Sequence, residues 1–323
     1  MRLLITGATG FVGKALCEVA TDFGAHIRAA SRQPFDFGAG IENSVIPDLG
    51  GIGNFSVSTP EALHNAVKDV DVVVHLAARV HVMQESESDA ITAYRRVNVE
   101  GTLQLARAAL AAGVNRFIYL SSIKVNGEST EHEHPFTADG VAKPEDPYGV
   151  SKLEAEQALI KLTQSTNMEL VIIRPPLVYG PGVGANFAAM MRWLSYHLPL
   201  PLGSIQNRRS MVGLDNLTDL ILRCCYHPAA AGQVFLVSDG HDVSVSELLR
   251  RITRLMELSN RLMPIPMPVI RLVASLLGKR AIAQRLCGSL QVDIEKTCRL
   301  LEWSPPVSLD AGLKKTVDWF LAK

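Results

Sequence analysis

The stretch "ITGATGFVGKAL" (Ile5–Leu16) decides the fold. It follows the apolar residues of a strand candidate, "RLLITG", and leads into a helical pattern that ends at Gly24. Between them stand Gly7, Gly10 and Gly13. Glycine is needed at such a turn for its tightness, for close approach of the backbone to a pyrophosphate, and for packing of the helix on the strand. Because the turn lies between a strand and a helix, it predicts a dinucleotide-binding site.

The residues that follow alternate between apolar runs typical of buried strands and amphipathic helical stretches. This alternation predicts βαβ units and a Rossmann-type, doubly wound parallel sheet. After Arg174 the sequence becomes richer in loops, which predicts a smaller, mostly helical C-terminal substrate region. We therefore expect a dinucleotide-binding domain over residues 1–175, to which 209–238 returns, and a substrate-binding region over 176–208 and 239–323. The strands are expected in "RLLITG", "HIRAAS", "VDVVVHLAA", "RFIYLSS" and "LVIIRPP", and the helices in "GKALCEVATDFG", "AYRRVNVEGTLQLARAALAAG" and "SKLEAEQALIKLTQS".

Composition excludes several classes of protein. The 323 residues carry 32 basic and 32 acidic side chains, so no basic excess points to nucleic acid. The five cysteines show no C-x-x-C spacing, which indicates reduced thiols in a cytoplasmic protein. No signal peptide is expected. The apolar stretch "LMPIPMPVIRLVASLLG" contains three prolines and Arg271, so we expect a buried or interfacial helix there, with weak membrane association left open.

"PYGVSK" (Pro147–Lys152) places Tyr148 four residues before Lys152, on the same face of a helix. A phenol with a pKa near 10 is a poor base at neutral pH, but an adjacent ammonium and an oxidised nicotinamide, both positive, favour the phenolate and lower that pKa. For this pair taken alone, the alternative interpretation is two solvated side chains on the surface of a helix. Its occurrence after a glycine turn and a serine-ended strand favours acid/base chemistry.

These motifs together resemble the short-chain dehydrogenase/reductase superfamily, in particular its extended branch. The likeness rests on G-x-x-G-x-x-G at Gly7–Gly13, then "HLAA", "VNVEGT", "LSSIKVNG", "YGVSK" and "RPPLVYGPG" in the family's order. It implies a Ser122, Tyr148 and Lys152 catalytic set. The cofactor contacts that it implies are Gly7, Gly10, Phe11, Val12, Gly13, Ser31, Arg32, Asp48, Leu49, Leu76, Ala77, Ala78, Asn98, Tyr148, Lys152 and Pro175.

The end of the second strand bears on the choice of cofactor. NAD-preferring sites carry Asp or Glu there, on the ribose 2′-hydroxyl. Here the position falls on Ser31, followed by Arg32. A hydroxyl and a guanidinium suit a 2′-phosphate, so we expect NADP(H) to be favoured, with NAD(H) as the alternative.

The resemblance also suggests the substrate. Asn186 and Arg209 match the places where sugar-nucleotide enzymes hold the pyrophosphate, although an N-cap and a solvated arginine would explain them too. The 4,6-dehydratases carry an Asp-Glu pair after the serine, where this chain has Ile123-Lys124, so dehydration is disfavoured. Asn126 stands where the family's "VYG" ending has tyrosine, which bears on the shape of the sugar pocket.

The first functional expectation is therefore reduction of a 4-keto UDP-sugar of the N-acetylated 6-deoxyhexose kind. The alternative is a UDP-hexose 4-epimerase, and a third reading is a non-catalytic dinucleotide sensor. We expect a homodimer formed through a helix bundle. We expect neither a metal site at "EHEH" (Glu131–His134) nor redox chemistry at Cys224-Cys225, and His75 is expected to be a packed residue.

Overall fold

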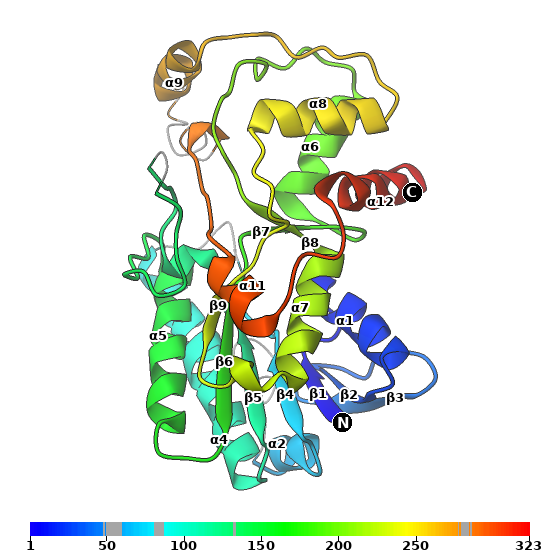
Figure 1. The fold of residues 1–323 in the computed structure, drawn as a ribbon, viewed down its shortest axis with the longest axis vertical. Coiled ribbons are helices and arrows are strands. Elements are labelled where there is room, and N and C mark those ends of the chain that lie inside the picture. The colour runs from blue at the N-terminus through cyan, green and yellow to red at the C-terminus, as the bar shows by residue number, and fades with distance from the viewer. Residues whose placement is uncertain are drawn as a thin grey trace.

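A computed structural model describes residues 1–47, 49, 60–80, 87–131, 134–276, 278, 284 and 286–323. Its main element is a parallel sheet of seven strands in the order β3-β2-β1-β4-β5-β6-β9, which confirms the predicted Rossmann-type architecture (Figure 1). The strands are β1 (Arg2–Thr6), β2 (His26–Ser31), β3 (Ile41–Val45), β4 (Val72–His75), β5 (Arg116–Leu120), β6 (Glu169–Arg174) and β9 (Val234–Leu236).

The strand order reverses between β1 and β4, which pair directly through Leu3↔Val72 to Thr6↔His75. In open sheets of this kind the crevice beyond the carboxyl ends of the strands, at such a reversal, is where ligands bind. The glycine turn leaves β1 at this point, so the topology places the predicted cofactor site at the carboxyl edge.

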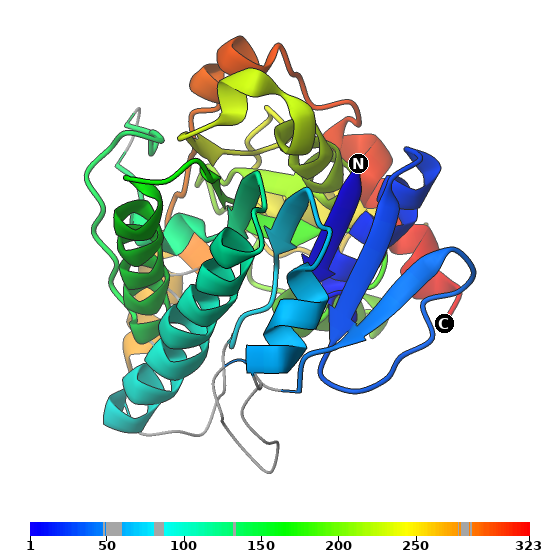
Figure 2. The same cartoon turned by 90° about the horizontal axis from the view of Figure 1, so that it is seen from below.

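Helices cover both faces of the sheet because its strands carry apolar side chains on both sides. Along β1, Leu3 and Ile5 belong to the core beneath α1 and α7, whereas Leu4 belongs to the core beneath α2, α4 and α5. Figure 2 shows the second set of helices lying against the strands. The bounds of these helices are α1 (Phe11–Asp22), α7 (Leu214–Tyr226), α2 (Pro60–Val67), α4 (Thr102–Ala111) and α5 (Pro147–Thr163).

A smaller helical region lies beyond the carboxyl edge, at the upper end of Figure 1. Its core gathers apolar residues such as Met191, Leu249 and Leu313 from three different helices. A separate pair of parallel strands, β7 (Leu177–Tyr179) and β8 (Met211–Gly213), precedes it. The helices of this region are α6 (Ala185–Ser195), α8 (Val245–Leu255), α9 (Met267–Leu276) and α12 (Leu309–Leu321), whereas α11 (Glu295–Leu301) packs beside β9 on the core of the sheet.

Local structure departs from the sequence prediction in three places. The long helix expected over residues 93–113 is α3 (Glu87–Tyr94) followed by a π-helix (Arg95–Gly101) and α4. Helix α5 begins at Pro147 because the side chain of Asp146 accepts from the amide of Gly149 and proline is tolerated at the first helical position. The edge strand β3 and the two-stranded sheet lack a clear apolar period and were not predicted.

None of the helices in the described part of the chain is long and apolar enough to cross a membrane.

Candidate active site

The glycine turn after β1 has the close backbone packing expected of a phosphate-binding turn. Gly7 adopts a φ of +68°, and a Cβ there would lie 2.8 Å from the amide nitrogen of Ala77. A Cβ on Gly13 would lie 2.2 Å from the carbonyl oxygen of Gly7. Gly10 caps α1, and no side chain accepts a hydrogen bond there. Backbone amides at a helix N-terminus bind anions, so this turn fits the pyrophosphate of a dinucleotide.

The ends of β2 and β4 flank this turn. Ser31 is buried and its hydroxyl donates to the carbonyl of Gln33 at 2.6 Å, while Arg32 is exposed beside it. His75 is buried, with Nδ1 2.7 Å from Thr6 Oγ1 and Nε2 2.9 Å from Thr102 Oγ1. Burial holds its pKa near 3, so the ring is a neutral packing residue that joins β1, β4 and α4.

The three residues predicted to be catalytic meet at the carboxyl end of β5. Ser122 hydrogen-bonds Tyr148, and it also caps the short 3-10 helix Ile123–Val125 by accepting from the Lys124 amide at 3.3 Å. Lys152 lies one turn beyond Tyr148, and its Nζ donates to the carbonyl of Leu120 at 2.8 Å. The same ammonium lies 4.5 Å from the centre of the Tyr119 ring.

Burial shifts both titrating groups of this set. It lowers the pKa of Lys152 to about 7, against an opposing effect of Glu156. Burial, followed by Asp146 and Tyr94, raises the pKa of Tyr148 above its ordinary value, while the Ser122 hydrogen bond acts in the opposite direction. Among the groups of the chain, desolvation therefore has the larger effect on Tyr148, and the predicted lowering of its pKa involves the positive charge of an oxidised nicotinamide as well as Lys152.

A buried ion pair behind the catalytic set was missed by sequence reasoning. Glu156 Oε2 lies 2.5 Å from Arg174 Nη2, and both side chains are almost fully buried. The hydroxyl of Ser121 donates to Glu156, and Arg174 also donates to Asn126 Oδ1 at 3.1 Å. The spacing of Tyr148, Lys152 and Glu156, four residues apart each time, was a signal that could have found Glu156 on the same helix face.

Lys124 and Asp146 form a second unpredicted pair beside Tyr148. The Lys124 ammonium contacts Asp146, the N-cap residue of α5, and lies 3.0 Å from Glu128. Because Asp146 starts the helix that carries Tyr148, this pair fixes the first turn of α5 against the end of β5. Lys124 occupies the segment where an acidic pair would mark a dehydratase, and it serves here in an ion pair.

Asn98 lies in the π-helix and links three segments. Its amide nitrogen donates to Ser151 Oγ at 3.0 Å, and its oxygen accepts from the Arg79 amide at 2.8 Å. A π-helical turn within an α-helical stretch often occurs at a functional site. The turn brings this buried side chain between the segment after β4 and α5.

The remaining predicted contacts are distributed around these groups. The carbonyl of Pro175 accepts from the amide of Ile123 at 3.0 Å. Leu49 is buried, and a Cβ on Gly101 would lie 2.7 Å from its carbonyl oxygen. Asp48 lies outside the described residues. Phe11 and Val12 begin α1, and Leu76–Ala78 follow β4.

The two predicted pyrophosphate contacts lie in the C-terminal region. Asn186 belongs to the first turn of α6, and its side chain is outside the described part of the structure. Arg209 donates from Nη1 to the carbonyl of Gly288 at 3.1 Å, and burial lowers its pKa. Its backbone forms a bridge to Leu290, whose side chain packs with Ile123. Arg209 is thereby tied to the segment that follows Ser122.

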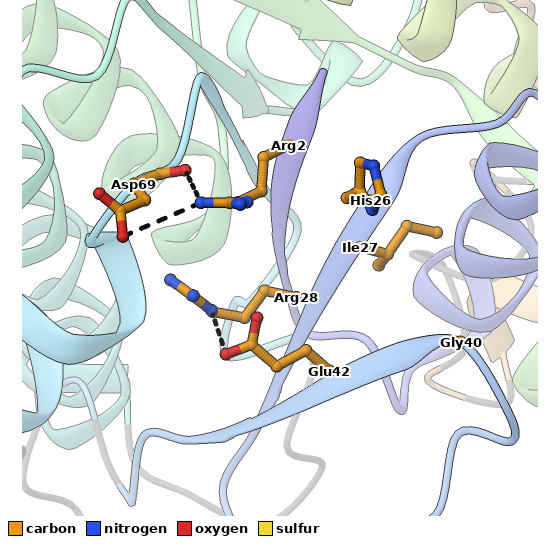
Figure 3. A pocket seen from close by; sticks show the side chains of 7 residues that line it. All are labelled: Arg2, His26, Ile27, Arg28, Gly40, Glu42 and Asp69. Carbon is orange, nitrogen blue, oxygen red and sulfur yellow. Dashed lines mark hydrogen bonds and ion pairs between the residues drawn. The ribbon is translucent and has the colours of Figure 1, made fainter.

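A pocket of about 370 Å³ at the amino edge of the sheet has a different character. Figure 3 shows its two ion pairs: Arg2 lies 3.9 Å from Asp69, and Arg28 lies 2.9 Å from Glu42. The Arg28 guanidinium also donates to the last carbonyls of α2, which is a helix-capping role. This edge is opposite to the one that carries the glycine turn and Tyr148.

Within the residues that the structure describes, no three His, Cys, Asp or Glu side chains lie close enough to hold a metal ion. The central pair of the "EHEH" segment, 132–133, lies outside those residues. The predicted core cysteines, Cys224 and Cys225, are buried in α7, and burial raises the pKa of both thiols.

A parallel sheet with a glycine turn after β1 and a Tyr-x-x-x-Lys pair after β5 defines an oxidoreductase fold of the short-chain dehydrogenase/reductase type. The sequence matches the NAD dependent epimerase/dehydratase family over residues 3–238. A UDP-glucose 4-epimerase of Vibrio cholerae is 47% identical over 321 residues, which cover 99% of this chain and 95% of that relative. The chain therefore belongs to this family, and it is an NAD-dependent sugar-nucleotide enzyme of the extended short-chain dehydrogenase/reductase type.

Solved structures agree with the fold. A UDP-glucuronic acid 4-epimerase from Bacillus cereus in complex with NAD superposes with a TM-score of 0.78 at 21% identity, covering 100% of this chain and 99% of that one. A UDP-glucose 4-epimerase from Thermotoga maritima with UDP-glucose gives a TM-score of 0.76 at 20% identity, with coverage of 100% and 99%.

Proposed function

We propose that this chain is a UDP-hexose 4-epimerase. The observation that carries the proposal is the meeting of Ser122, Tyr148 and Lys152 at the carboxyl edge that also carries the glycine turn, in a chain that is 47% identical to a UDP-glucose 4-epimerase. The comparisons favour this activity over the reduction of a 4-keto sugar, which was the first expectation from the sequence. The intact catalytic set also argues against a non-catalytic dinucleotide sensor.

In this proposal Tyr148 is the acid/base group for the hydroxyl at carbon 4 of the sugar. Ser122, already hydrogen-bonded to Tyr148, positions the reacting oxygen. Lys152 contributes positive charge one turn away and is held in place by the carbonyl of Leu120. The bound dinucleotide supplies the reversible hydride acceptor, so that removal of a hydride and its return on the other face invert carbon 4.

The proposed substrate contacts are Arg209 and Asn186, which bind the pyrophosphate of the UDP moiety. The partly desolvated guanidinium of Arg209 supports this assignment, since a charge in a low-dielectric setting interacts strongly with phosphate oxygens. In this proposal residues 1–175 and 209–238 hold the cofactor, and residues 176–208 and 239–323 hold the sugar nucleotide.

The cofactor contacts proposed are those named from the sequence, from Gly7 to Pro175. We propose that Arg32 favours NADP over NAD, because a cation stands beside Ser31 where an acidic residue would mark an NAD site. Hydride removal and return are chemically the same with either cofactor. The proposal includes a cytoplasmic homodimer formed through a helix bundle.

Purified protein is incubated with UDP-glucose, UDP-galactose, their N-acetylated counterparts and a 4-keto UDP-sugar, first without added cofactor and then with NAD(H) or NADP(H), and the products are resolved by chromatography. Inversion at carbon 4 without net consumption of cofactor is expected. Consumption of NADPH with a 4-keto sugar, and no epimerisation, would replace the proposal with the reductase. Absence of turnover with every sugar and cofactor would favour the sensor.

A further inference from the structure

Helix α9 (Met267–Leu276) presents an apolar stripe to solvent. Val269, Leu272, Val273 and Leu276 are 46%, 61%, 48% and 78% exposed. Their spacing places them on one side of the helix. Met267 and Ile270, which lie off this stripe, pack against the core of the C-terminal region. The outer face of this helix is therefore apolar where a surface helix is ordinarily polar.

Exposed aromatic side chains also occur elsewhere in the C-terminal region. The amide of Leu200 donates to the carbonyl of Arg261 at 3.2 Å, and the amide of Met263 donates to the carbonyl of Leu200 at 2.8 Å. These bonds tie the segment before α9 to the segment after α6. At the end of α6, Trp193 and Tyr196 are 53% and 64% exposed. Exposed Trp and Tyr are typical of surfaces that sit at a membrane interface.

The sequence around α9 carries an excess of positive charge. Residues 258–292 contain five cations, at Arg261, Arg271, Lys279, Arg280 and Arg285, and no acidic residue, in a chain whose formal net charge is zero. Arg271 is exposed within α9 itself. An apolar stripe combined with a local excess of Lys and Arg is the pattern of a helix that lies on an anionic lipid surface.

We propose that α9 docks this enzyme on an anionic phospholipid surface, with its apolar stripe inserted at the headgroup boundary. The helix has 10 residues, a length of about 15 Å, so it suits lying in the interface and not spanning the ~30 Å hydrocarbon core. A second copy of the chain is a poorer occupant of this face, because pairing two copies of α9 would bring together two helices that each carry an exposed Arg271. An anionic surface complements that charge.

The helix lies at the end of the molecule remote from the amino edge of the sheet, among the elements at the top of Figure 1. Docking through it would direct the C-terminal region toward the lipid. The dinucleotide-binding sheet would face away from the surface.

The test is co-sedimentation of the full chain with vesicles of phosphatidylcholine alone and with vesicles that also contain phosphatidylglycerol. Val273→Glu is compared with Val19→Glu, since Val19 is an exposed valine on α1 and the charge change is the same. The wild type and Val19→Glu are expected to bind the anionic vesicles, and Val273→Glu is expected to bind at least tenfold more weakly. Arg271→Gln should weaken binding roughly fivefold, the share of one cation near the surface.

Thermal unfolding of each variant controls for folding. Sedimentation velocity without lipid examines the other occupant of the face. Absence of wild-type binding to anionic vesicles, equal binding to neutral ones, or equal loss in Val19→Glu would overturn the proposal. A wild-type oligomer that Val273→Glu alone dissociates, without vesicle binding, would assign the face to a second copy.

Discussion

Both edges of the parallel sheet carry charged side chains, but one ion pair from each edge shows a large difference in exposure to water. At the amino edge, the side chains of Arg2 and Asp69 are 46% and 65% exposed. At the carboxyl edge, Arg174 and Glu156 are 7% and 2% exposed, and Lys152 is buried one turn before Glu156. Water screens the first pair and has almost no access to the second.

The difference shows that buried charged groups, which cost stability, occur at the edge that carries the proposed active site. Screened ion pairs contribute little to stability, whereas desolvation at the carboxyl edge lowers the pKa of Lys152 and raises that of Tyr148. Perturbed groups that cluster in this way are typical of active sites. The pocket at the amino edge is lined by ion pairs and a helix cap, whereas the acid/base candidates lie at the carboxyl edge.

Tyr148→Phe should have the largest effect, because it removes the proposed acid/base group while leaving the ring in place. Turnover is expected to fall about 10²-fold or more, with cofactor affinity nearly unchanged. Steady-state epimerisation assays and cofactor titration measure the two. Tyr226→Phe, at an exposed tyrosine of α7, serves as the control and should be neutral. Near-normal turnover of Tyr148→Phe would remove Tyr148 from the mechanism.

Glu156→Gln and Asp69→Asn compare the two edges directly. The first leaves the Arg174 guanidinium buried without its countercharge and should lower the free energy of unfolding by about 3 kcal/mol. The second affects an exposed pair at a residue with a φ of +57°, which Asn tolerates, so the change should stay below about 0.5 kcal/mol. Urea unfolding measures both. Equal losses would contradict the contrast between the edges.

Arg209→Ala should weaken UDP binding by about 1.5–3 kcal/mol, or roughly ten- to a hundredfold, because a charge-assisted contact to the pyrophosphate is lost. Isothermal titration of UDP into the two proteins measures this. Arg208→Ala is the matched control, since its side chain is exposed next to Arg209. If the two variants bind alike, Arg209 is not a phosphate contact.

Arg32→Ala should weaken NADP binding by about 1.5 kcal/mol, or roughly tenfold, and change NAD binding little. Fluorescence titration with each cofactor gives the ratio. Lys68→Ala removes an exposed cation from the amino edge and should change neither affinity. An equal loss for NAD and NADP would show that Arg32 does not contact a 2′-phosphate.

The last effect expected is a pH dependence of stability that comes from Lys152. Its pKa is about 7 in the folded chain and 10.5 ordinarily, so between these values the unfolded chain binds the additional proton. The destabilising contribution of burying the ammonium is full below about pH 7 and is lost as the pH rises toward 10.5. The wild type should therefore gain stability relative to Lys152→Met between pH 7 and 9, by at most ~1.4 kcal/mol per pH unit. Urea unfolding at several pH values would show this slope, and parallel profiles would exclude it.

The local pattern of the sequence was sufficient for the sheet and for the position of its ligand edge. Buried parallel strands are near-continuous apolar runs, and the glycine triplet marks a turn whose backbone packing few other residues permit. Tyr148 and Lys152 could be paired from their spacing because a single helix carries both. The family resemblance supplied Ser122, which lies on a different segment.

The tertiary structure decided what depends on residues that are distant along the chain. Glu156 and Arg174 are 18 positions apart, and only the packing of α5 on β6 encloses them together. The directions of the pKa shifts follow from that enclosure, because desolvation depends on every element around a group and not on its neighbours in sequence. For α9 the sequence left a buried or an interfacial helix open, and only the structure shows which side faces outward, since periodicity gives the face of a helix but not the side on which the core lies.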